Sequence, residues 1–493
     1  MLPFWPARRM VAALAAGELS SRELLAALAE QVDRHNPAVN AVVTLDLDGA
    51  RQAADRADAD RADAARSPGR PPGRLAGLPM TVKDAIETAG LRSTGGAVDL
   101  AHHVPAADAP AVARLREAGA VVFGKTNLPT WSADAQTSND LFGTTVNPWD
   151  AARTAGGSSG GAAVAVATGM TPLELGTDVF GSVRIPAAFC GVYGLKPTYG
   201  LVPQRGYLRD RSGGTTVDLP VNAFGPLART ADDLALALSV LAGRRLADLR
   251  PPPGRSLAGH RVAVWLDSPH CPVDGEVAEV LRAAADDLAD AGARVTECRP
   301  PVDPEEALAV LFALVPPAAE PGAAGGVGPR PSRPTGGSDG DAALPARRAR
   351  LQAAWERWFA DVDVLLCPVA PTVAFPHDLR PDRSERVTWV NGRRRPYLDG
   401  VGWTGVVGVA HLPAVAAPVG PSRSGLPVGV QVVAPPLGDL VAVGFAGLLA
   451  EVCGGFRPPP GVGPVQAPPG FGPVQAPPGV TPAPAPPGGE GRR

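Results

Sequence analysis

The stretch from residue 156 to residue 186 begins with Gly-Gly-Ser-Ser-Gly-Gly (156–161) and ends with Leu-Gly-Thr-Asp-Val-Phe-Gly-Ser-Val-Arg-Ile-Pro (175–186). Residues 162–168, between the two motifs, are small and predict a helix. Each motif carries a serine next to glycine, Ser158 and Ser182. Glycine lets the backbone approach a substrate carbonyl and point N–H groups at a developing oxyanion. The stretch therefore predicts a nucleophilic serine site.

Lysine is nearly absent from the chain, which makes the few lysines informative. Lys and Arg together number 46, and only Lys83, Lys125 and Lys196 are lysines. Arginine stays protonated, whereas a buried lysine can become a neutral amine. Lys83 stands out because the segment 77–84 reads as a turn and a short apolar strand that ends in this basic group. The contexts of the other two lysines fit a structural role equally well.

Several motifs, taken together, resemble the amidase signature family. They follow one another in the family's order and spacing, and the resemblance covers roughly residues 10–455. The matching segments are Gly-Leu-Pro-x-x-x-Lys-Asp (77–84), Gly-Lys-Thr-Asn-Leu-Pro (124–129), Asn-Pro-Trp (147–149), the serine motif 156–161, Thr-Asp-x-x-Gly-Ser-x-Arg-x-Pro (177–186), Gly-Pro with Arg-Thr (225–230) and Gly-Leu-Pro-x-Gly-x-Gln (425–431).

The resemblance implies a Ser–Ser–Lys triad and an amidase that works through a serine acyl-enzyme. Ser182 would attack an amide carbonyl, and Ser158, which follows a cis peptide bond in the family, would relay the proton to Lys83. Lys83 would act as a neutral base, which requires a pKa well below the ordinary 10.4 or so of lysine. Burial shifts a lysine pKa in that direction. Three residues of the signature would support the site: Ser159, Asp178 and Arg184.

The resemblance also implies an oxyanion hole formed by the N–H groups of Val179, Phe180, Gly181 and Ser182. The family usually has two glycines before the nucleophile, whereas this chain has Phe180 followed by Gly181. A bulky residue is unfavourable at φ > 0. We therefore expect Phe180 either to strain this turn or to narrow the acyl pocket.

Alternating helix and strand patterns predict an α/β fold with a large mixed β-sheet covered on both faces by helices, as in amidase signature enzymes. We expect one catalytic domain over residues 1–456. Within it, residues 316–341 are rich in Pro, Gly, Ser and Ala and predict a flexible insertion. Residues 457–493 repeat Gly-Pro-Val-Gln-Ala-Pro-Pro-Gly and predict a disordered tail.

Charge and cysteine content exclude several classes of protein. A net charge of −3 without a basic stripe argues against nucleic acid as a partner. Five scattered cysteines favour neither a disulfide framework nor a zinc ribbon, and they fit the cytoplasm. The uncharged stretch 401–423 contains glycines and prolines that favour buried strands and turns over a membrane span. We expect no metal, no cofactor and a small-molecule amide substrate, and the sequence is compatible with a homodimer.

Two other catalytic motifs match in letters. Residues 119–126 fit the phosphate-loop pattern G-x-x-x-x-G-K-[ST], but the four middle residues read as a strand. Residues 156–160 fit the G-x-S-x-G elbow of an α/β-hydrolase esterase. That enzyme would need a triad histidine such as His377 or His411, and the segment before its serine is not a strand pattern.

Within the amidase signature family, the A subunit of a tRNA-dependent amidotransferase is the main alternative. That protein would work as a glutaminase and supply ammonia to a partner. The run Leu-Val-Pro-Gln-Arg at 201–205 differs from the Val-Ser-Arg typical of these glutaminases. The sequence alone therefore favours a stand-alone amidase.

Overall fold

The computed structural model describes residues 1–66, 73–210, 212–252, 254, 256–315 and 339–462. Over this part of the chain, eleven strands form one mixed sheet in the order β1-β3-β2-β6-β8-β7-β14-β15-β11-β9-β10. The strands of this sheet are β1 (Val42–Leu45), β2 (Pro79–Lys83), β3 (Val121–Thr126), β6 (Leu173–Asp178), β7 (Tyr193–Lys196), β8 (Ala223–Ala228), β9 (Arg261–Val264), β10 (Arg294–Glu297), β11 (Val364–Pro368), β14 (Ala414–Pro421) and β15 (Pro427–Val433).

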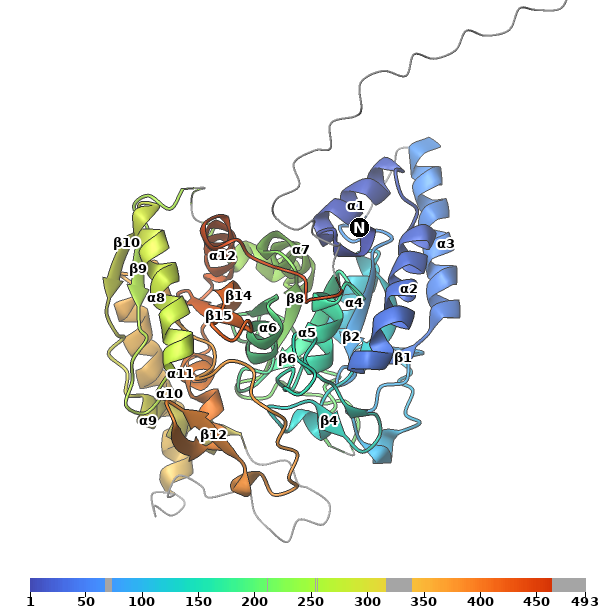
Figure 1. The fold of residues 1–493 in the computed structure, drawn as a ribbon. Helices are drawn as coiled ribbons and strands as arrows, with labels where there is room; N and C mark the ends of the chain where they lie inside the picture. The colour runs from blue at the N-terminus through green and yellow to red at the C-terminus, as the bar shows by residue number, and fades with distance from the viewer. Residues whose placement is uncertain (67–72, 211, 253, 255, 316–338, 463–493) are drawn as a thin grey trace, which may run out of the picture.

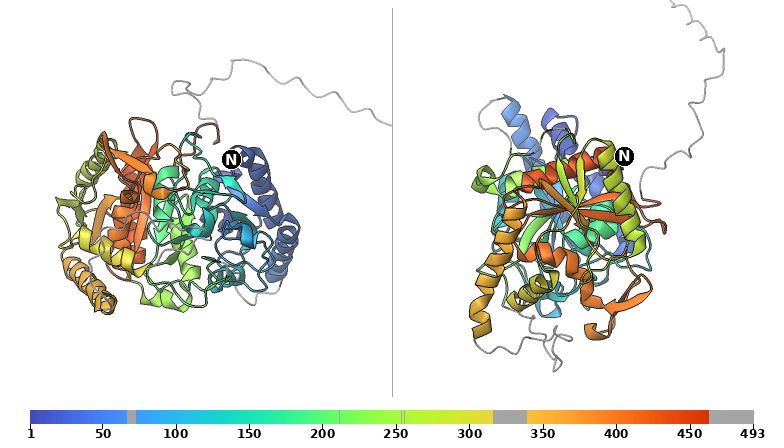
Figure 2. Two further views of the ribbon diagram at one scale, coloured as in Figure 1. Left: turned by 90° about the horizontal axis from the view of Figure 1, so that it is seen from below. Right: turned by 90° about the vertical axis from the view of Figure 1, so that its left-hand side faces the viewer.

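Helices cover both faces of this sheet, so the predicted α/β fold is confirmed (Figure 1). Figure 2, right, shows the strands fanning out between helical layers. The α-helices are α1 (Ala7–Ala16), α2 (Ser21–Val39), α3 (Leu47–Arg66), α4 (Pro110–Glu117), α5 (Gly160–Ala167), α6 (Arg184–Cys190), α7 (Ala231–Leu241), α8 (Gly275–Asp290), α9 (Pro304–Leu314), α10 (Asp339–Trp358), α11 (Gly402–Val409) and α12 (Asp439–Cys453). Two short hairpins pair β4 (Ser138–Asn139) with β5 (Gly143–Thr144), and β12 (Val387–Val390) with β13 (Arg393–Pro396).

The middle of the sheet is layered between two pairs of helices. Gly194 has no side chain on the face where Ala187 of α6 packs, while the neighbouring Tyr193 points to the opposite face, toward α12. Helix α5 packs against α6, and α7 packs against α12. Because successive strand residues alternate between faces, α5 and α6 cover one face and α12 covers the other. Helix α5 is fully buried and built almost entirely from Gly, Ala and Val, which lets it lie close to the strands.

Local sequence signals explain several elements. The spacing of Ser20 and Glu23 predicts a capping box, and the two residues form one at the start of α2. The sequence patterns predict helices over residues 109–119, 162–168 and 230–241. Helices α4 and α7 lie within the first and third of these ranges, and α5 begins two residues before the second. The apolar runs around 120–123, 262–266 and 364–366 predict strands, and β3, β9 and β11 lie there.

Two local predictions are wrong. The apolar pattern at Val202 predicts a short extended segment, but Val202 lies in a bend. The stretch 401–423 contains helix α11 before strand β14, where only strands and turns were expected. Helix α11 is buried all round, so the periodic polar face that would have marked a helix is missing from its sequence.

Most of the two low-complexity segments lies outside the described residues. Of the expected insertion 316–341, only residues 339–341 are described, and they begin α10. Of the expected tail 457–493, residues 457–462 are described, without helix or strand. None of the described helices is long and apolar enough to cross a bilayer.

Candidate active site

Strands β2 and β6 are parallel neighbours, third and fourth in the sheet order, and they bring the two halves of the predicted site together. Lys83 is the last residue of β2, and Asp178 is the last residue of β6. The segment with Ser158 leads into α5, and the segment with Ser182 connects β6 to α6. The carboxyl ends of parallel strands are where α/β folds place ligands.

The amine of Lys83 is fully buried and bound by two hydroxyl groups. Its Nζ donates to Ser158 Oγ and to Thr177 Oγ1, each at 2.7 Å. The peptide bond between Gly157 and Ser158 is cis. Burial lowers the pKa of Lys83 well below 10.5, and the carboxyl groups of Asp178 and Glu174 oppose that shift only in part. A neutral amine in contact with a hydroxyl can accept its proton.

Ser182 is joined to this pair through the main chain. The N–H of Ser159 donates to the carbonyl oxygen of Ser182 at 3.0 Å, and Ser159 Oγ donates to the carbonyl of Thr177 at 3.3 Å. Ser182 is half-buried, and its hydroxyl makes no hydrogen bond to another described residue. The structure therefore brings Lys83 and Ser158 into direct contact. The hydroxyl of Ser182 makes no hydrogen bond to a described residue, and its main chain is hydrogen-bonded to the residue that follows Ser158.

The turn before Ser182 shows how the chain accommodates Phe180. Gly181 has φ of 111°, and a Cβ there would lie 2.5 Å from Thr404 Oγ1, whereas Phe180 is not among the residues with positive φ. Glycine is thus required at 181 and not at 180, so the strain considered for Phe180 does not arise. The Phe180 ring packs against Phe312 of α9, with ring centroids 5.5 Å apart.

The main-chain N–H groups of this turn are unequal. The Gly181 N–H donates to Asp178 Oδ1 at 2.8 Å and is therefore engaged. The N–H groups of Val179, Phe180 and Ser182 have no hydrogen-bond partner among the described residues. Three of the four expected oxyanion donors are consequently available to a ligand.

A buried ion pair holds the turn in place. Arg184 Nη2 lies 2.8 Å from Asp178 Oδ1, and both side chains are fully buried. Arg184 also donates to Gln431 Oε1 at 2.5 Å and to the carbonyl of Thr404 at 3.0 Å. Burial alone would raise the pKa of Asp178, but Arg184 beside it brings the pKa down to about 2. Asp178 is therefore a constant negative charge that fixes the turn by accepting N–H groups.

The sequence patterns did not single out two polar residues that lie near Lys83. Thr177 supplies the second hydroxyl to Lys83, although it stands inside the quoted signature next to Asp178. Glu174 on β6 is buried and accepts hydrogen bonds from Thr81 and, at 2.9 Å, from Thr126. Burial raises the pKa of Glu174 to about 8.

The structure argues against both the phosphate-loop and the α/β-hydrolase interpretations. Residues 124–126 lie inside strand β3, and Lys125 Nζ donates to the carbonyl of Ile86 and to the hydroxyls of Thr88 and Ser93. This lysine faces buried oxygens and not a phosphate loop. His411 contacts the carbonyl of Pro220 and stacks on Tyr199.

The histidine partner that an α/β-hydrolase needs is also missing. Ser158 Oγ is bound by Lys83, and neither His377 nor His411 makes a hydrogen bond to Ser158 among the described residues. The same part of the chain contains no group of three or more His, Cys, Asp or Glu that could hold a metal ion.

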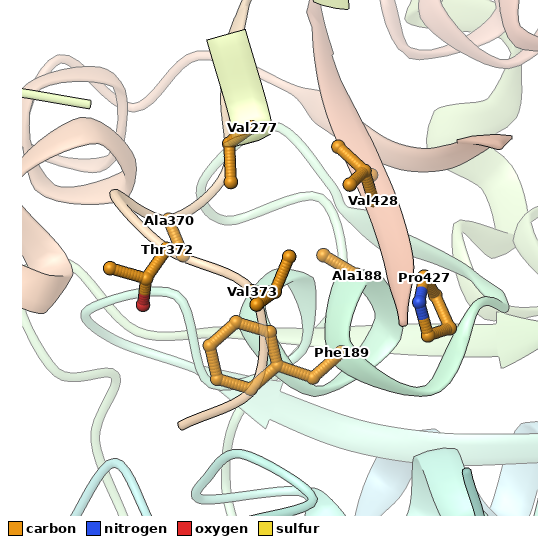
Figure 3. A pocket seen from close by; sticks show the side chains of 9 residues that line it. Ala188, Phe189, Val277, Ala370, Thr372, Val373, Pro427 and Val428 are labelled. Carbon is orange, nitrogen blue, oxygen red and sulfur yellow. The ribbon is translucent and has the colours of Figure 1, made fainter. Parts of the chain in front are cut away.

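A small pocket elsewhere in the molecule lacks catalytic groups. It lies between α6 and β15 (Figure 3), and neither a titratable side chain nor any residue of the predicted triad lines it. Its lining is mainly apolar and includes Ala188, Phe189, Val277, Val373, Pro427 and Val428. The chemistry of the chain is therefore not located there.

A mixed sheet flanked by helices, with a buried lysine at the end of β2 hydrogen-bonded to a serine, fits an amide hydrolase of the α/β class. The amidase family model matches residues 23–322 and 340–441. The chain therefore belongs to the amidase signature family, and it is an enzyme that acts on amide C–N bonds.

Individual relatives and solved structures are similar to most of the chain. The A subunit of the glutamyl-tRNA(Gln) amidotransferase of Roseiflexus sp. (strain RS-1) is 36% identical over 468 residues, which cover 85% of this chain and 91% of that protein. A solved amidase structure is 28% identical with a TM-score of 0.74, covering 91% of this chain and 99% of that one. The solved structure of the Thermotoga maritima counterpart of the Roseiflexus protein is 26% identical with a TM-score of 0.72, covering 93% and 98%.

Proposed function

We propose that the chain hydrolyses a carboxylic acid amide to the acid and ammonia or an amine through an acyl-enzyme on Ser182. The observation that carries the proposal is the fully buried Lys83 amine, 2.7 Å from the Ser158 hydroxyl. Ser182 Oγ attacks the amide carbon while Ser158 takes the proton of Ser182 and passes its own to Lys83. The unpaired N–H groups of Phe180 and Ser182 are the donors that support the oxyanion.

The remaining steps return the same proton. The ammonium group of Lys83 gives its proton, through Ser158, to the leaving nitrogen, and the C–N bond breaks to leave an ester on Ser182. Water then attacks the ester carbon and gives a proton through Ser158 to Lys83, which returns it through Ser158 to Ser182 Oγ as the ester bond breaks. The acid leaves, and Lys83 is neutral again. Each step needs an amine with a lowered pKa, which burial supplies here.

The fate of the ammonia separates two candidates. The curated relatives, such as the Roseiflexus protein, are named as A subunits of an amidotransferase, and this favours the glutaminase alternative over a stand-alone amidase. In that role, the chain would work in an assembly that acts on glutamyl-tRNA(Gln). The solved amidase of similar overlap and the differing run at 201–205 support the stand-alone alternative less directly.

Ammonia release from the purified chain tests both points. We expect release from at least one amide in a panel of L-glutamine and simple aliphatic and aryl amides, and a loss of roughly 10⁴-fold or more in Ser182→Ala. Turnover of simple amides without a partner would favour the stand-alone amidase, and glutamine turnover that needs partner proteins would favour the amidotransferase role. Wild-type rates in Ser182→Ala would refute the proposed nucleophile.

A further inference from the structure

Asn222 is a buried carboxamide without a partner. It immediately precedes β8 and is fully buried, and neither its Oδ1 nor its Nδ2 has a hydrogen-bond partner among the described residues. Asn147 is equally buried, but its Nδ2 donates to the carbonyls of Thr154 and Phe189, each at 3.0 Å, and its Oδ1 accepts from the Trp149 N–H at 2.9 Å. A buried polar group left unpaired is unfavourable, so Asn222 calls for a partner outside the protein.

The sheet register places Asn222 on the face that carries the Lys83 amine's second hydroxyl. Thr177 of β6 pairs with Phe224 of β8, and cross-strand partners share a face. Asn222 is two residues before Phe224 and directly before the first residue of β8, so we infer from the alternation of the strand that its side chain lies on the same face. The Tyr207 ring contacts Phe224. Burial raises the pKa of Tyr207, and the Thr177 hydroxyl beside its phenol opposes that rise. Asn222 thus faces the surroundings of Thr177.

Contacts on both sides of Asn222 fix its backbone. The carbonyl oxygen of Pro220 accepts from Arg348 Nη1 at 3.0 Å and lies 2.8 Å from His411 Nε2. Ala223, on the other side, pairs with Asp178 at the base of the predicted oxyanion turn. The carboxamide is therefore held by a rigid segment, which is what a recognition group requires.

We propose that Asn222 is a specificity-determining residue that binds the acyl part of the substrate. Its Oδ1 accepts from an N–H group and its Nδ2 donates to an oxygen, so the substrate class is an amide whose acyl chain ends in a neighbouring N–H donor and oxygen acceptor. A terminal carboxamide and the amino-acid end of glutamine both have this chemistry. The inference rests on the proposed function, because it names the substrate of that same site.

A matched pair of amides tests the assignment. Pentanediamide and 5-methylhexanamide have the same chain length, and the second carries an isopropyl group in place of the distal carboxamide. In the wild type, kcat/KM for ammonia release should be higher for pentanediamide. In Asn222→Leu, the ratio of the two kcat/KM values should fall by about tenfold to 100-fold, because the polar contact is lost and an apolar one replaces it. An unchanged ratio, or a wild-type preference for 5-methylhexanamide, overturns the assignment.

Thermal stability separates recognition from a structural role. Because Asn222 has no partner in the described protein, Asn222→Leu should leave Tm unchanged or raise it. The control Asn147→Leu removes three hydrogen bonds and should lower Tm. A fall in Tm for Asn222→Leu similar to that of Asn147→Leu would assign Asn222 to the fold and overturn the proposal.

Two further outcomes separate the sources of the ligand and distinguish the role of Asn222 from the proposed function. If L-glutamine shows the same dependence on Asn222 as pentanediamide, the N–H donor is an amino-acid ammonium group; if only pentanediamide does, it is a carboxamide. Both results support the proposed class. If neither these probes nor the wider amide panel releases ammonia in a Ser182-dependent way, the proposed function itself fails, whereas normal turnover with an unaltered ratio rejects only Asn222.

Discussion

Lys83 and Lys125 lie on the neighbouring strands β2 and β3, one register position apart, and both amines are fully buried. Lys125 Nζ donates to three acceptors, one of which is the carbonyl oxygen of Ile86, an atom that can only accept. Lys83 Nζ contacts only two hydroxyls, and a hydroxyl can also donate. The two lysines are therefore equally buried, but their amines have different hydrogen-bond partners.

The partners decide which amine can act as a base. Three acceptors match the three N–H bonds of an ammonium group, so the surroundings of Lys125 favour the charged form, helped by Asp84. Burial still lowers the pKa of Lys125 to about 8. The pKa of Lys83 falls well below 10.5, and only two hydroxyl groups accept hydrogen bonds from its amine. In the proposed mechanism, burial and hydroxyl partners together make Lys83 the general base, whereas burial alone leaves Lys125 in a structural role.

Of the predictions that compare the two lysines, the largest change in catalytic activity is expected at Lys83. Lys83→Met removes the base and should lower kcat/KM for amide hydrolysis by about 10²–10⁴-fold, since this is the usual contribution of acid–base catalysis. The fold should persist because methionine fills most of the same volume. Steady-state ammonia release together with circular dichroism checks both parts. Activity within tenfold of wild type would remove Lys83 from the mechanism.

A smaller effect of a different kind is expected at Lys125. Lys125→Met leaves a carbonyl and two hydroxyls without their donor and should lower the free energy of unfolding by about 3 kcal/mol. The folded variant should keep a kcat/KM near that of wild type. Urea unfolding followed by fluorescence, with activity corrected for the folded fraction, measures the two quantities. Unchanged stability with a loss of activity as large as in Lys83→Met would reverse the roles of the two lysines.

The smallest effect concerns pH. If the neutral form of Lys83 is the active one, kcat/KM rises as pH increases through the pKa of Lys83, which lies well below 10.5. The carboxyl group of Glu174 raises that pKa, so Glu174→Gln should move the rise in activity toward lower pH or leave it in place. A pH profile of both proteins from acid to mildly alkaline conditions checks the sign. A shift toward higher pH in Glu174→Gln would contradict this account.

The sequence predicted the fold and the motif residues because both depend on local patterns. Alternating elements predicted the α/β sheet, and the scarcity of lysine singled out three residues that are all buried. That scarcity did not separate Lys83 from Lys125 and Lys196, because the difference lies in partners that come from distant segments. Lys196, for example, donates to the carbonyl of Leu412, 216 residues away along the chain.

The remaining site residues were beyond local patterns. Glu174 reads as a polar residue between two leucines of β6, and nothing nearby in sequence shows that its partners are Thr81 and Thr126. Asn222 reads as an ordinary loop residue, because its lack of a partner is a property of the packed structure. Helix α11 was missed since a helix buried on every side has no amphipathic period.

The hydrogen bond from the Ser159 N–H to the Ser182 carbonyl involves no side-chain atom. Substitutions in the walls around bound substrate therefore need not disturb the spacing between the two serine-bearing segments. A lineage could exchange one acyl group for another by altering residues such as Phe180 or Asn222 and retain the same reaction geometry. If these residues contact substrate as proposed, the backbone link would let substrate choice change while the spacing of the two serine segments stays the same.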